Sequence, residues 1–244
     1  MKKVNIIIPM AGKGRRFSEK GYIKPKPLID VKGTPMIERV VNNLVIDNYR
    51  FHLIIQKKHF NENLDFFNQL RSKYDTKYYL IDTYTEGALM TVLSAQEALF
   101  EDSPILIANS DQIIEIDYSN FVRDMFDRDL DGSIMTFRSN EKKWSYIKTD
   151  DEKVVLVKEK EVISDLATTG LYLFKSSLEF LSAAIELIVK NDRYNNEFYV
   201  APVYNYLISR RKKIGYYNIE KSKFFGVGTP EDLMIYLEHL NEKI

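Results

Sequence analysis

The opening stretch of the chain, residues 5–37, constrains the fold more than any other part: it reads NIIIPMAGKGRRFSEKGYIKPKPLIDVKGTPMI. Residues 4–8 form a short apolar run rich in β-branched side chains, which is typical of a buried parallel strand. Pro9 should end the hydrogen-bond ladder of this strand because proline has no N–H group. The following run MAGKGRR has no helical periodicity, so we expect a loop. Its glycines should be there because the loop needs backbone conformations that other residues rarely adopt.

This loop has the composition of a polyphosphate site. Two glycines flank Lys13, and Arg15 and Arg16 follow, so free backbone N–H groups should lie beside three positive charges. Two common phosphate motifs are excluded, because Phe17 occupies the third glycine position of G-x-G-x-x-G and the G-x-x-x-x-G-K-[ST] pattern is not matched. The alternative is an ordinary strand-to-helix turn with solvated basic residues.

The continuation of the stretch, KPKPLIDV followed by KGTPMI, adds several linked motifs in a fixed order. Together they resemble the signature of the nucleotide-sugar pyrophosphorylases, also called sugar-1-phosphate nucleotidyltransferases, and the resemblance continues at spaced points to Leu233. It implies that Arg16 and Lys26 are the catalytic cations facing the phosphates, while Arg15 replaces a small hydroxyl residue. The nucleotide-binding loop that it implies consists of Met10, Ala11, Gly12, Lys13 and Gly14.

Helix-like and strand-like segments alternate through the first half of the chain. This order predicts an α/β fold with one doubly wound, mostly parallel sheet, Rossmann-like in architecture; the resemblance implies the GT-A-type nucleotidyltransferase version of it. We expect strands over residues 51–55, 78–81 and 104–108, helices over residues 36–45 and 61–73, and a further helix that follows Ala88 and reaches Leu99.

Residues 82–88, DTYTEGA, connect a predicted strand to a predicted helix. The resemblance implies a base-recognition loop in which Gly87 lies against the nucleobase, and Asp82 stands where relatives often carry glutamine. An ionised carboxylate only accepts hydrogen bonds, so direct contact between Asp82 and the base would favour guanine. Alternatively, Asp82 caps a turn and Gly87 begins a helix, with Glu86 near the helix dipole.

Asp111 follows the strand predicted over residues 104–108. Ligand sites of open α/β sheets lie beyond the carboxyl ends of the strands, which would bring Asp111 close to the glycine loop. A carboxylate there can hold Mg²⁺ against substrate phosphates, and the resemblance implies that Asp111 is the metal ligand. An Asx turn is the simpler alternative. The second metal carboxylate expected from the resemblance is replaced by Gly226.

The pattern changes from Gly132 onward. Four strand-like runs with short links, residues 133–137, 144–148, 154–157 and 170–174, predict a mixed or antiparallel extension on the acceptor side.

Helices are expected over residues 178–189 and from residue 195 to residue 208. In this half the resemblance implies four acceptor-binding residues, Glu159, Lys160, Gly170 and Glu197. The charge triplet at residues 158–160 could equally face solvent, and Glu197 would be stabilised in the first turn of a helix in any case.

Composition limits the remaining classes of function. The 244 residues contain 35 basic and 35 acidic side chains, so no global field favours nucleic acid or an anionic membrane. The absence of cysteine excludes disulfides and thiolate metal sites. No stretch approaches the roughly 18 apolar residues of a membrane span. We expect a cytoplasmic protein with one nucleotidyltransferase domain over residues 1–244. Residues 1–131 should form its nucleotide-binding half and residues 132–244 its acceptor-binding half. The sequence does not decide between a monomer and a homo-oligomer.

The expected activity is transfer of a nucleoside monophosphate from an NTP to a phosphorylated sugar or similar phospho-alcohol, with release of pyrophosphate. The resemblance implies Mg²⁺ as the cofactor and a place in nucleotide-sugar and polysaccharide biosynthesis. A glycosyltransferase is a weaker alternative because the D-x-D metal motif is missing after Asp111. A non-catalytic nucleotide sensor is a third reading, motivated by Gly226.

Overall fold

The computed structural model describes residues 2–242, and its first half is built on four parallel strands. β1 lies between β4 and β6, and β5 pairs with the outer edge of β4. All four predicted strands are confirmed: β1 is Val4–Pro9, β4 is Tyr49–Gln56, β5 is Thr76–Ile81 and β6 is Ile105–Ala108. The prediction that Pro9 ends the ladder was wrong. Pro9 still pairs with Ile54, because the Met10 amide donates to the Ile54 carbonyl at 2.9 Å and continues the ladder.

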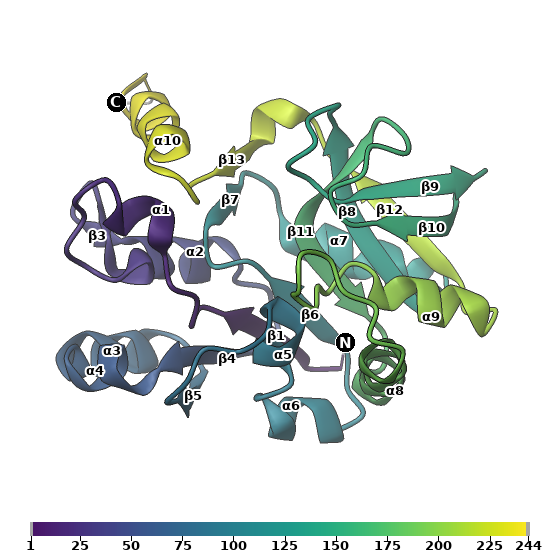
Figure 1. Ribbon diagram of the computed structural model, residues 1–244, viewed down its shortest axis with the longest axis horizontal. Coiled ribbons are helices and arrows are strands. Elements are labelled where there is room, and N and C mark those ends of the chain that lie inside the picture. The colour runs from purple at the N-terminus through teal and green to yellow at the C-terminus, as the bar shows by residue number, and fades with distance from the viewer. Residues whose placement is uncertain (1, 243–244) are drawn as a thin grey trace.

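A mixed extension, antiparallel except for the parallel pairing of β12 with β8, completes the same sheet on the other side of β6 (Figure 1). β11 joins the two parts, since it pairs antiparallel with β6 and also with β8 and β9. The mixed extension predicted from the sequence is therefore confirmed. Its strands are β8 Gly132–Arg138, β9 Tyr146–Asp150, β10 Lys153–Lys158, β11 Leu166–Phe174 and β12 Ile214–Asn218.

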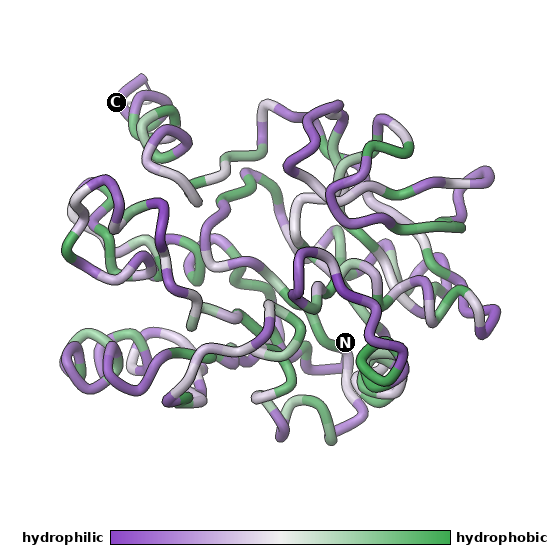
Figure 2. The backbone as a smooth tube through the Cα atoms, in the orientation of Figure 1, coloured by the Kyte–Doolittle hydropathy of each residue, from purple (hydrophilic) through white to green (hydrophobic). Residues whose placement is uncertain are grey.

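Helices cover both faces of this sheet, as in a doubly wound fold. One hydrophobic cluster takes Ile6 and Ile8 from β1, and a second takes Ile7, because successive strand residues point to opposite faces. The first cluster includes residues of α2 Met36–Asn43, α4 Leu64–Lys73, α7 Tyr118–Asp127 and α10 Pro230–Glu242. The second includes residues of α5 Ala88–Val92, α6 Gln96–Phe100, α8 Ser177–Val189 and α9 Val203–Ser209. Figure 2 shows hydrophobic stretches in the strands between these layers.

Two small sheets and four short helical elements complete the fold around the large sheet. β7 pairs antiparallel with β13, which brings a late segment of the chain beside Asp111. The strands are β2 Asp30–Val31, β3 Thr34–Pro35, β7 Gln112–Ile114 and β13 Phe224–Gly226. The remaining helices are α1 Arg15–Ser18, α3 Lys57–Asn61 and the 3₁₀ turns η1 Lys26–Leu28 and η2 Lys221–Lys223.

Two helix predictions were wrong in detail. The helix expected to follow Ala88 and reach Leu99 is divided into α5 and α6, because the chain turns at Ala95, whose backbone is not helical. The helix expected from residue 195 begins only at Val203, and residues 194–197 instead form a tight turn closed by a bridge between Tyr194 and Glu197. Within residues 2–242, the structure contains no helix with the length and apolar character needed to cross a membrane.

Candidate functional site

A cavity of about 640 Å³ opens at the carboxyl ends of β1 and β6. This is the edge at which open α/β sheets bind ligands. Its walls come from the glycine loop, η1, the loop before α5, the loop after β6 and two late segments of the chain. The lining residues are Pro9, Ala11, Gly12, Lys13, Gly14, Arg15, Arg16, Phe17, Lys26, Tyr84, Thr85, Gly87, Ala88, Thr91, Asp111, Glu197 and Gly228.

The glycine loop is held tightly on one side and open on the other. Gly14 has φ +60°, and a Cβ there would lie 3.1 Å from the Cβ of Lys26, so the loop packs directly on η1. A Cβ at Gly12 would meet no atom within 4 Å, which leaves its backbone open to the cavity. Phe17 is 1% exposed and anchors α1 in the core, where its ring contacts Tyr22. The basic side chains of the loop therefore extend from a backbone that packing holds in place.

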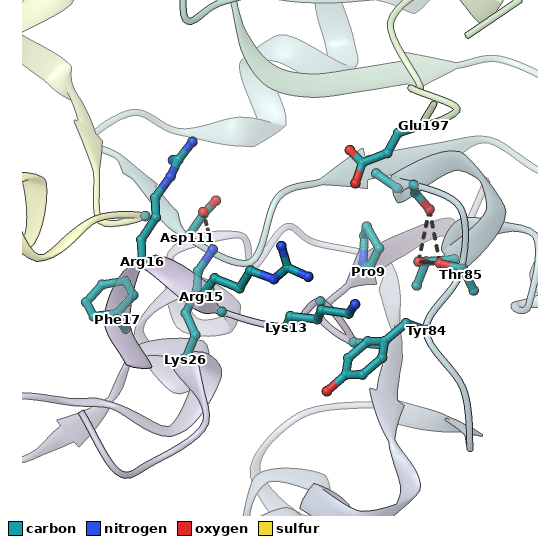
Figure 3. A pocket seen from close by; sticks show the side chains of 17 residues that line it. Pro9, Lys13, Arg15, Arg16, Phe17, Lys26, Tyr84, Thr85, Asp111 and Glu197 are labelled. Atoms are coloured by element: carbon teal, nitrogen blue, oxygen red, sulfur yellow. Dashed lines mark hydrogen bonds and ion pairs between the residues drawn. The ribbon is translucent and has the colours of Figure 1, made fainter. Parts of the chain in front are cut away.

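Four basic side chains line the cavity, as the sequence predicted for the loop and for Lys26. The ammonium of Lys13 lies 4.9 Å from the centre of the Tyr84 ring. In Figure 3, Arg16 and Asp111 lie on one side of the view, and Glu197 lies on the other. The cavity thus combines strong positive charge with a carboxylate at each side.

Lys26 and Asp111 form an ion pair across the cavity wall. Their side chains are 20% and 26% exposed, so the pair is only partly screened by solvent. The backbone around Asp111 is fixed by the late segment, because the Val227 amide donates to the Asp111 carbonyl at 2.8 Å. Gly228 passes so close that a Cβ there would lie 2.5 Å from Oδ2 of Asp111.

The environment of Asp111 suits a cation that takes few protein ligands. Among residues 2–242, no group of three or more histidine, aspartate or glutamate side chains is arranged to hold a metal ion. At Gly226, where the resemblance implies a second carboxylate, a Cβ would lie 3.8 Å from Oδ2 of Asp232. Asp111 is therefore a single carboxylate beside a cavity lined by basic side chains. Mg²⁺ is commonly bound in proteins by one or two carboxylates together with waters and phosphates.

Gly87 links the cavity to a distant part of the chain. It lines the cavity with φ +111°, yet a Cβ added there would lie 2.4 Å from the carbonyl oxygen of Phe198. Phe198 donates its amide to Glu86 O at 2.8 Å and accepts from the Leu89 amide at 3.1 Å, and Arg193 forms an ion pair with Glu86 at 2.6 Å. Gly87 is therefore required by a close backbone contact, which no local pattern in the sequence indicated.

Gln56 was missed by sequence reasoning, although it connects two walls of the cavity. Its Nε2 donates to Ala11 O at 3.0 Å and to Thr83 O at 3.3 Å, so it ties the glycine loop to the loop before α5. Tyr84 and Thr85, which line the cavity, were also missed. The only available signal was their position between a strand and Gly87.

Two residues predicted to bind the nucleotide lie apart from the lining of this cavity. Met10 is 2% exposed and packs in the hydrophobic cluster that contains Ile6. Asp82 is largely exposed, and its carboxylate lies 3.6 Å from the ammonium of Lys57. The structure therefore gives Asp82 an ion-pair partner outside the cavity.

A second cavity of about 200 Å³ adjoins the first at Ala88, which lines both. It contains Glu159 and Gly170, two of the residues predicted for the acceptor side. Its lining residues are Ala88, Asn109, Lys143, Trp144, Ser145, Glu159, Thr168, Thr169, Gly170, Tyr172, Tyr199, Val200 and Ala201.

Gly170 is explained by a contact inside this second cavity. It has φ +87°, and a Cβ there would lie 2.1 Å from Nδ2 of Asn109. The Asn109 amide in turn donates to Oε1 of Gln112 at 3.4 Å. The prediction of a close approach at Gly170 is thus accounted for by a neighbouring side chain of the protein.

The other two predicted acceptor residues, Lys160 and Glu197, are linked through Tyr199, which lines the smaller cavity. Tyr199 receives a hydrogen bond from the Lys160 ammonium at 2.9 Å and donates its hydroxyl to Glu197 at 2.8 Å. Glu197 lines the larger cavity. Its expected place in the first turn of a helix was wrong, because it lies in the turn closed by Tyr194. A helix dipole therefore does not account for Glu197.

Comparison with known proteins agrees with the fold described above. A model of the nucleotidyl transferase family matches residues 5–243. The chain is 27% identical to the nucleoside-diphosphate-sugar pyrophosphorylase from Vibrio cholerae RC9, whose crystal structure superposes with a TM-score of 0.84 over 96% of this chain and 99% of that one.

Two curated proteins are similar over different lengths. The bifunctional protein GlmU of Methanocaldococcus jannaschii is 24% identical over 99% of this chain and 55% of its own length, so the chain spans about half of that relative. The 2-aminoethylphosphonate cytidylyltransferase of Lancefieldella rimae is 56% identical over 43 residues, which are 18% of each chain.

Proposed function

The chain belongs to the nucleotidyl transferase family, and from this premise we propose that it transfers a nucleoside monophosphate from an NTP to a phosphorylated small molecule. The observation that carries the proposal is the convergence of an open glycine loop, four basic side chains and Asp111 on one cavity. Such a site can bind a triphosphate through backbone N–H groups and balance the charge of its phosphates.

In the proposed reaction, an oxygen of the acceptor's phosphate attacks the α-phosphorus of the NTP. A new P–O bond forms, and the bond from the α-phosphorus to the bridging oxygen of the β-phosphate breaks, so that pyrophosphate leaves with the electron pair. No covalent enzyme intermediate is needed. The work of the protein is to align the reactants and to neutralise charge, and we assign the latter to Arg16 and Lys26, with Lys13 and Arg15 beside them.

We further propose that Asp111 binds Mg²⁺ together with the substrate phosphates. Bound there, the ion would neutralise charge on the triphosphate and orient it. Lys26 lies against the same carboxylate, so the two cationic functions would be concentrated at one side of the α-phosphate. The single protein carboxylate is sufficient in this proposal because Mg²⁺ retains water and phosphate ligands.

Two classes of acceptor have separate support. The likeness to the Vibrio cholerae pyrophosphorylase favours a sugar phosphate, with an NDP-sugar as the product. The short, high-identity match to the Lancefieldella rimae enzyme favours an aminoalkyl phosphonate or phosphate, with CTP as the donor. Both reactions use the same step at the α-phosphorus and differ only in what the acceptor side must recognise.

A pyrophosphate-release screen tests the proposal directly. ATP, GTP, CTP, UTP and dTTP would each be combined, with Mg²⁺, with sugar-1-phosphates and with short phospho- and phosphono-alcohols and amines. We expect acceptor-dependent pyrophosphate release with at least one pair. A glycosyltransferase would instead release a nucleoside diphosphate from a finished nucleotide sugar, and a sensor would bind nucleotide without any release; either result would contradict the proposal.

A further inference from the structure

The smaller cavity has features that select the chemical class of the acceptor. Its volume is about 200 Å³, below the roughly 300–1,000 Å³ of sites for drug-sized ligands. It meets the larger cavity at Ala88. A molecule that fills it would therefore be short, with one end in the smaller cavity and the other directed toward the proposed nucleotide site.

The charged side chains that line this cavity are Lys143, which is half exposed and paired with Glu141 at 3.1 Å, and the buried Glu159. The Glu159 side chain is 8% exposed, and its Oε2 accepts a hydrogen bond from the Ser145 hydroxyl. Its Oε1 lies 4.0 Å from the Lys160 ammonium, which instead donates to the Tyr199 hydroxyl at 2.9 Å. Burial raises the pKa of the Glu159 carboxyl, against the opposing effects of Ser145 and Lys160. Burying this charge is costly unless a cation compensates it closely.

Aromatic and hydroxyl groups surround the same carboxylate. Trp144, Tyr172 and Tyr199 all line the cavity. Aromatic faces attract ammonium groups through their quadrupoles. Within this chain the Lys143 ammonium lies 4.7 Å from the Trp144 ring centre, and the Lys160 ammonium lies 4.7 Å from the Tyr199 ring centre. The Tyr172 hydroxyl shares a hydrogen bond with the Thr168 hydroxyl at 3.1 Å. A carboxylate surrounded by rings is suited to an ammonium group.

We propose that the smaller cavity binds the ammonium end of a short phosphorylated or phosphonylated alkylamine, with Glu159 as its counter-ion and Trp144, Tyr172 and Tyr199 as its walls. This inference rests on the proposed nucleotidyl transfer, since it names the acceptor of that reaction. The phosphate or phosphonate end would point through the junction at Ala88 to the α-phosphorus. The ammonium takes no part in the bond changes and serves only recognition.

The test compares matched acceptors in the pyrophosphate-release assay, with the NTP that gives the highest rate. Phosphoethanolamine, 2-aminoethylphosphonate and phosphocholine carry a cation; ethyl phosphate, glycerol 3-phosphate and glucose 1-phosphate do not. We expect kcat/KM to be highest for one of the three cationic compounds, and the ranking among them separates primary from quaternary ammonium and phosphate from phosphonate.

The variant Glu159→Gln keeps the shape of the side chain and removes its charge. A hydrogen bond to a charged group contributes enough that we expect kcat/KM to fall by about 10- to 150-fold for the cationic acceptors, while ethyl phosphate changes by less than about threefold. Glu161→Gln, an exposed acid two residues along the chain, is the matched control and should behave as wild type. Glu159→Asp retains the charge and should retain the preference for cationic acceptors even if Glu159→Gln folds poorly.

Calorimetric titration with 2-aminoethylphosphonate separates this inference from the proposed function. Pyrophosphate release with glucose 1-phosphate as the best acceptor would overturn the inference and leave nucleotidyl transfer intact. Glu159-dependent binding of 2-aminoethylphosphonate, without pyrophosphate release from any NTP, would support the cation site and overturn nucleotidyl transfer. Equal losses for cationic and neutral acceptors in Glu159→Gln would also overturn the inference, because they would indicate a structural role.

Discussion

At the scale of single residues, the ion pair between Lys26 and Asp111 is the most informative contact in the molecule. The two side chains come from elements 85 positions apart in the sequence and meet at the cavity wall. A lysine beside a carboxylate leaves little net charge at that point, whereas Arg15 and Arg16 remain available to anions. The fold thus brings together Lys26, which was predicted to be catalytic, and Asp111, which was predicted to bind the metal.

The cations of the cavity give the first prediction. Lys26→Ala and Arg16→Ala should each lower kcat by roughly a hundredfold or more, because removing one donor that stabilises the transition state typically costs about 2.7–4 kcal/mol. Lys24→Ala, which removes an exposed lysine two positions away, is the control and should keep near-normal activity. Wild-type rates in a Lys26 or Arg16 variant with an unchanged melting temperature would exclude that residue from catalysis.

Asp111 gives the second prediction. Asp111→Asn keeps the side-chain volume and removes the charge, so we expect the loss of most activity together with a much weaker dependence on Mg²⁺. Initial rates measured across a Mg²⁺ titration in both proteins would show this change. Full wild-type activity in the presence of excess chelator would contradict the proposed role of Asp111 in binding the metal.

For Gly87 and Gly170, the sequence predicted the location of the residue but not the contact that requires a glycine there. Gly87 and Gly170 were both predicted to lie at substrate sites, and both line the cavities. The reason for each glycine is different, however: the Phe198 backbone and the Asn109 amide fill the space that a Cβ would occupy. Contacts between segments about 110 and 60 positions apart depend on tertiary packing, which no local pattern records.

At the scale of secondary-structure elements, strand β11 carries the third prediction. Gly170→Ala should destabilise the protein through both its positive φ and the contact with Asn109. Gly21 has nearly the same φ, +85°, and a Cβ there would meet no atom within 4 Å. Gly21→Ala therefore measures the backbone cost alone, about 1–2 kcal/mol, and the excess in Gly170→Ala, about 1–3 kcal/mol, measures overpacking.

Urea unfolding of the two alanine variants provides the comparison. Equal destabilisation at the two positions would show that Asn109 moves aside without cost. In that case the glycine would be required by the backbone conformation of β11 and not by the crowding within the smaller cavity.

Elements with strong periodic signals were predicted well, and short ones were not. The buried parallel strands β1, β4 and β6 have continuous apolar runs, which explains why they were predicted from sequence. β7 and β13 have only three residues each and exist because they pair with each other across 110 positions. Such strands are stabilised by tertiary pairing, so their own residues carry too little signal.

At the scale of the whole molecule, His52 is a buried polar residue that connects neighbouring strands of the sheet. It is 1% exposed, and its ring nitrogens contact Asn5 Oδ1 at 2.9 Å and the Tyr79 hydroxyl at 3.1 Å. Burial, with Arg50 and Lys77 nearby, lowers the pKa of His52 from 6.5 to about 4. The imidazole is therefore a neutral component of the polar contacts that join β1, β4 and β5.

The fourth prediction concerns pH. Because the folded-state pKa of His52 is lower than its unfolded value, its contribution is fully present above pH 6.5 and is lost as the pH falls toward 4. The difference corresponds to up to about 3 kcal/mol of unfolding free energy. Urea unfolding at pH 7.5 and pH 4.5 should show a smaller decrease in His52→Gln than in wild type; an equal decrease would show that other groups control the acid sensitivity.

The fold class and the larger site could be predicted because they follow from local signals repeated along the chain. Alternating strands and helices indicated the doubly wound sheet, and the ends of its strands indicated where Asp111 and the glycine loop would meet. The aromatic wall of the smaller cavity could not be predicted, since Trp144, Tyr172 and Tyr199 converge from three separate segments. Gln56 was missed for the same reason.

The contact between Gly87 and Phe198 has a further consequence for how the molecule would handle its ligands. The segment at residues 86–89 borders the larger cavity, and the segment at residues 198–201 borders the smaller one. Two backbone hydrogen bonds and the Arg193–Glu86 ion pair hold these segments together, so ordering one also orders the other. We expect nucleotide and acceptor to bind synergistically, each raising the affinity of the other by the same factor, as thermodynamic linkage requires.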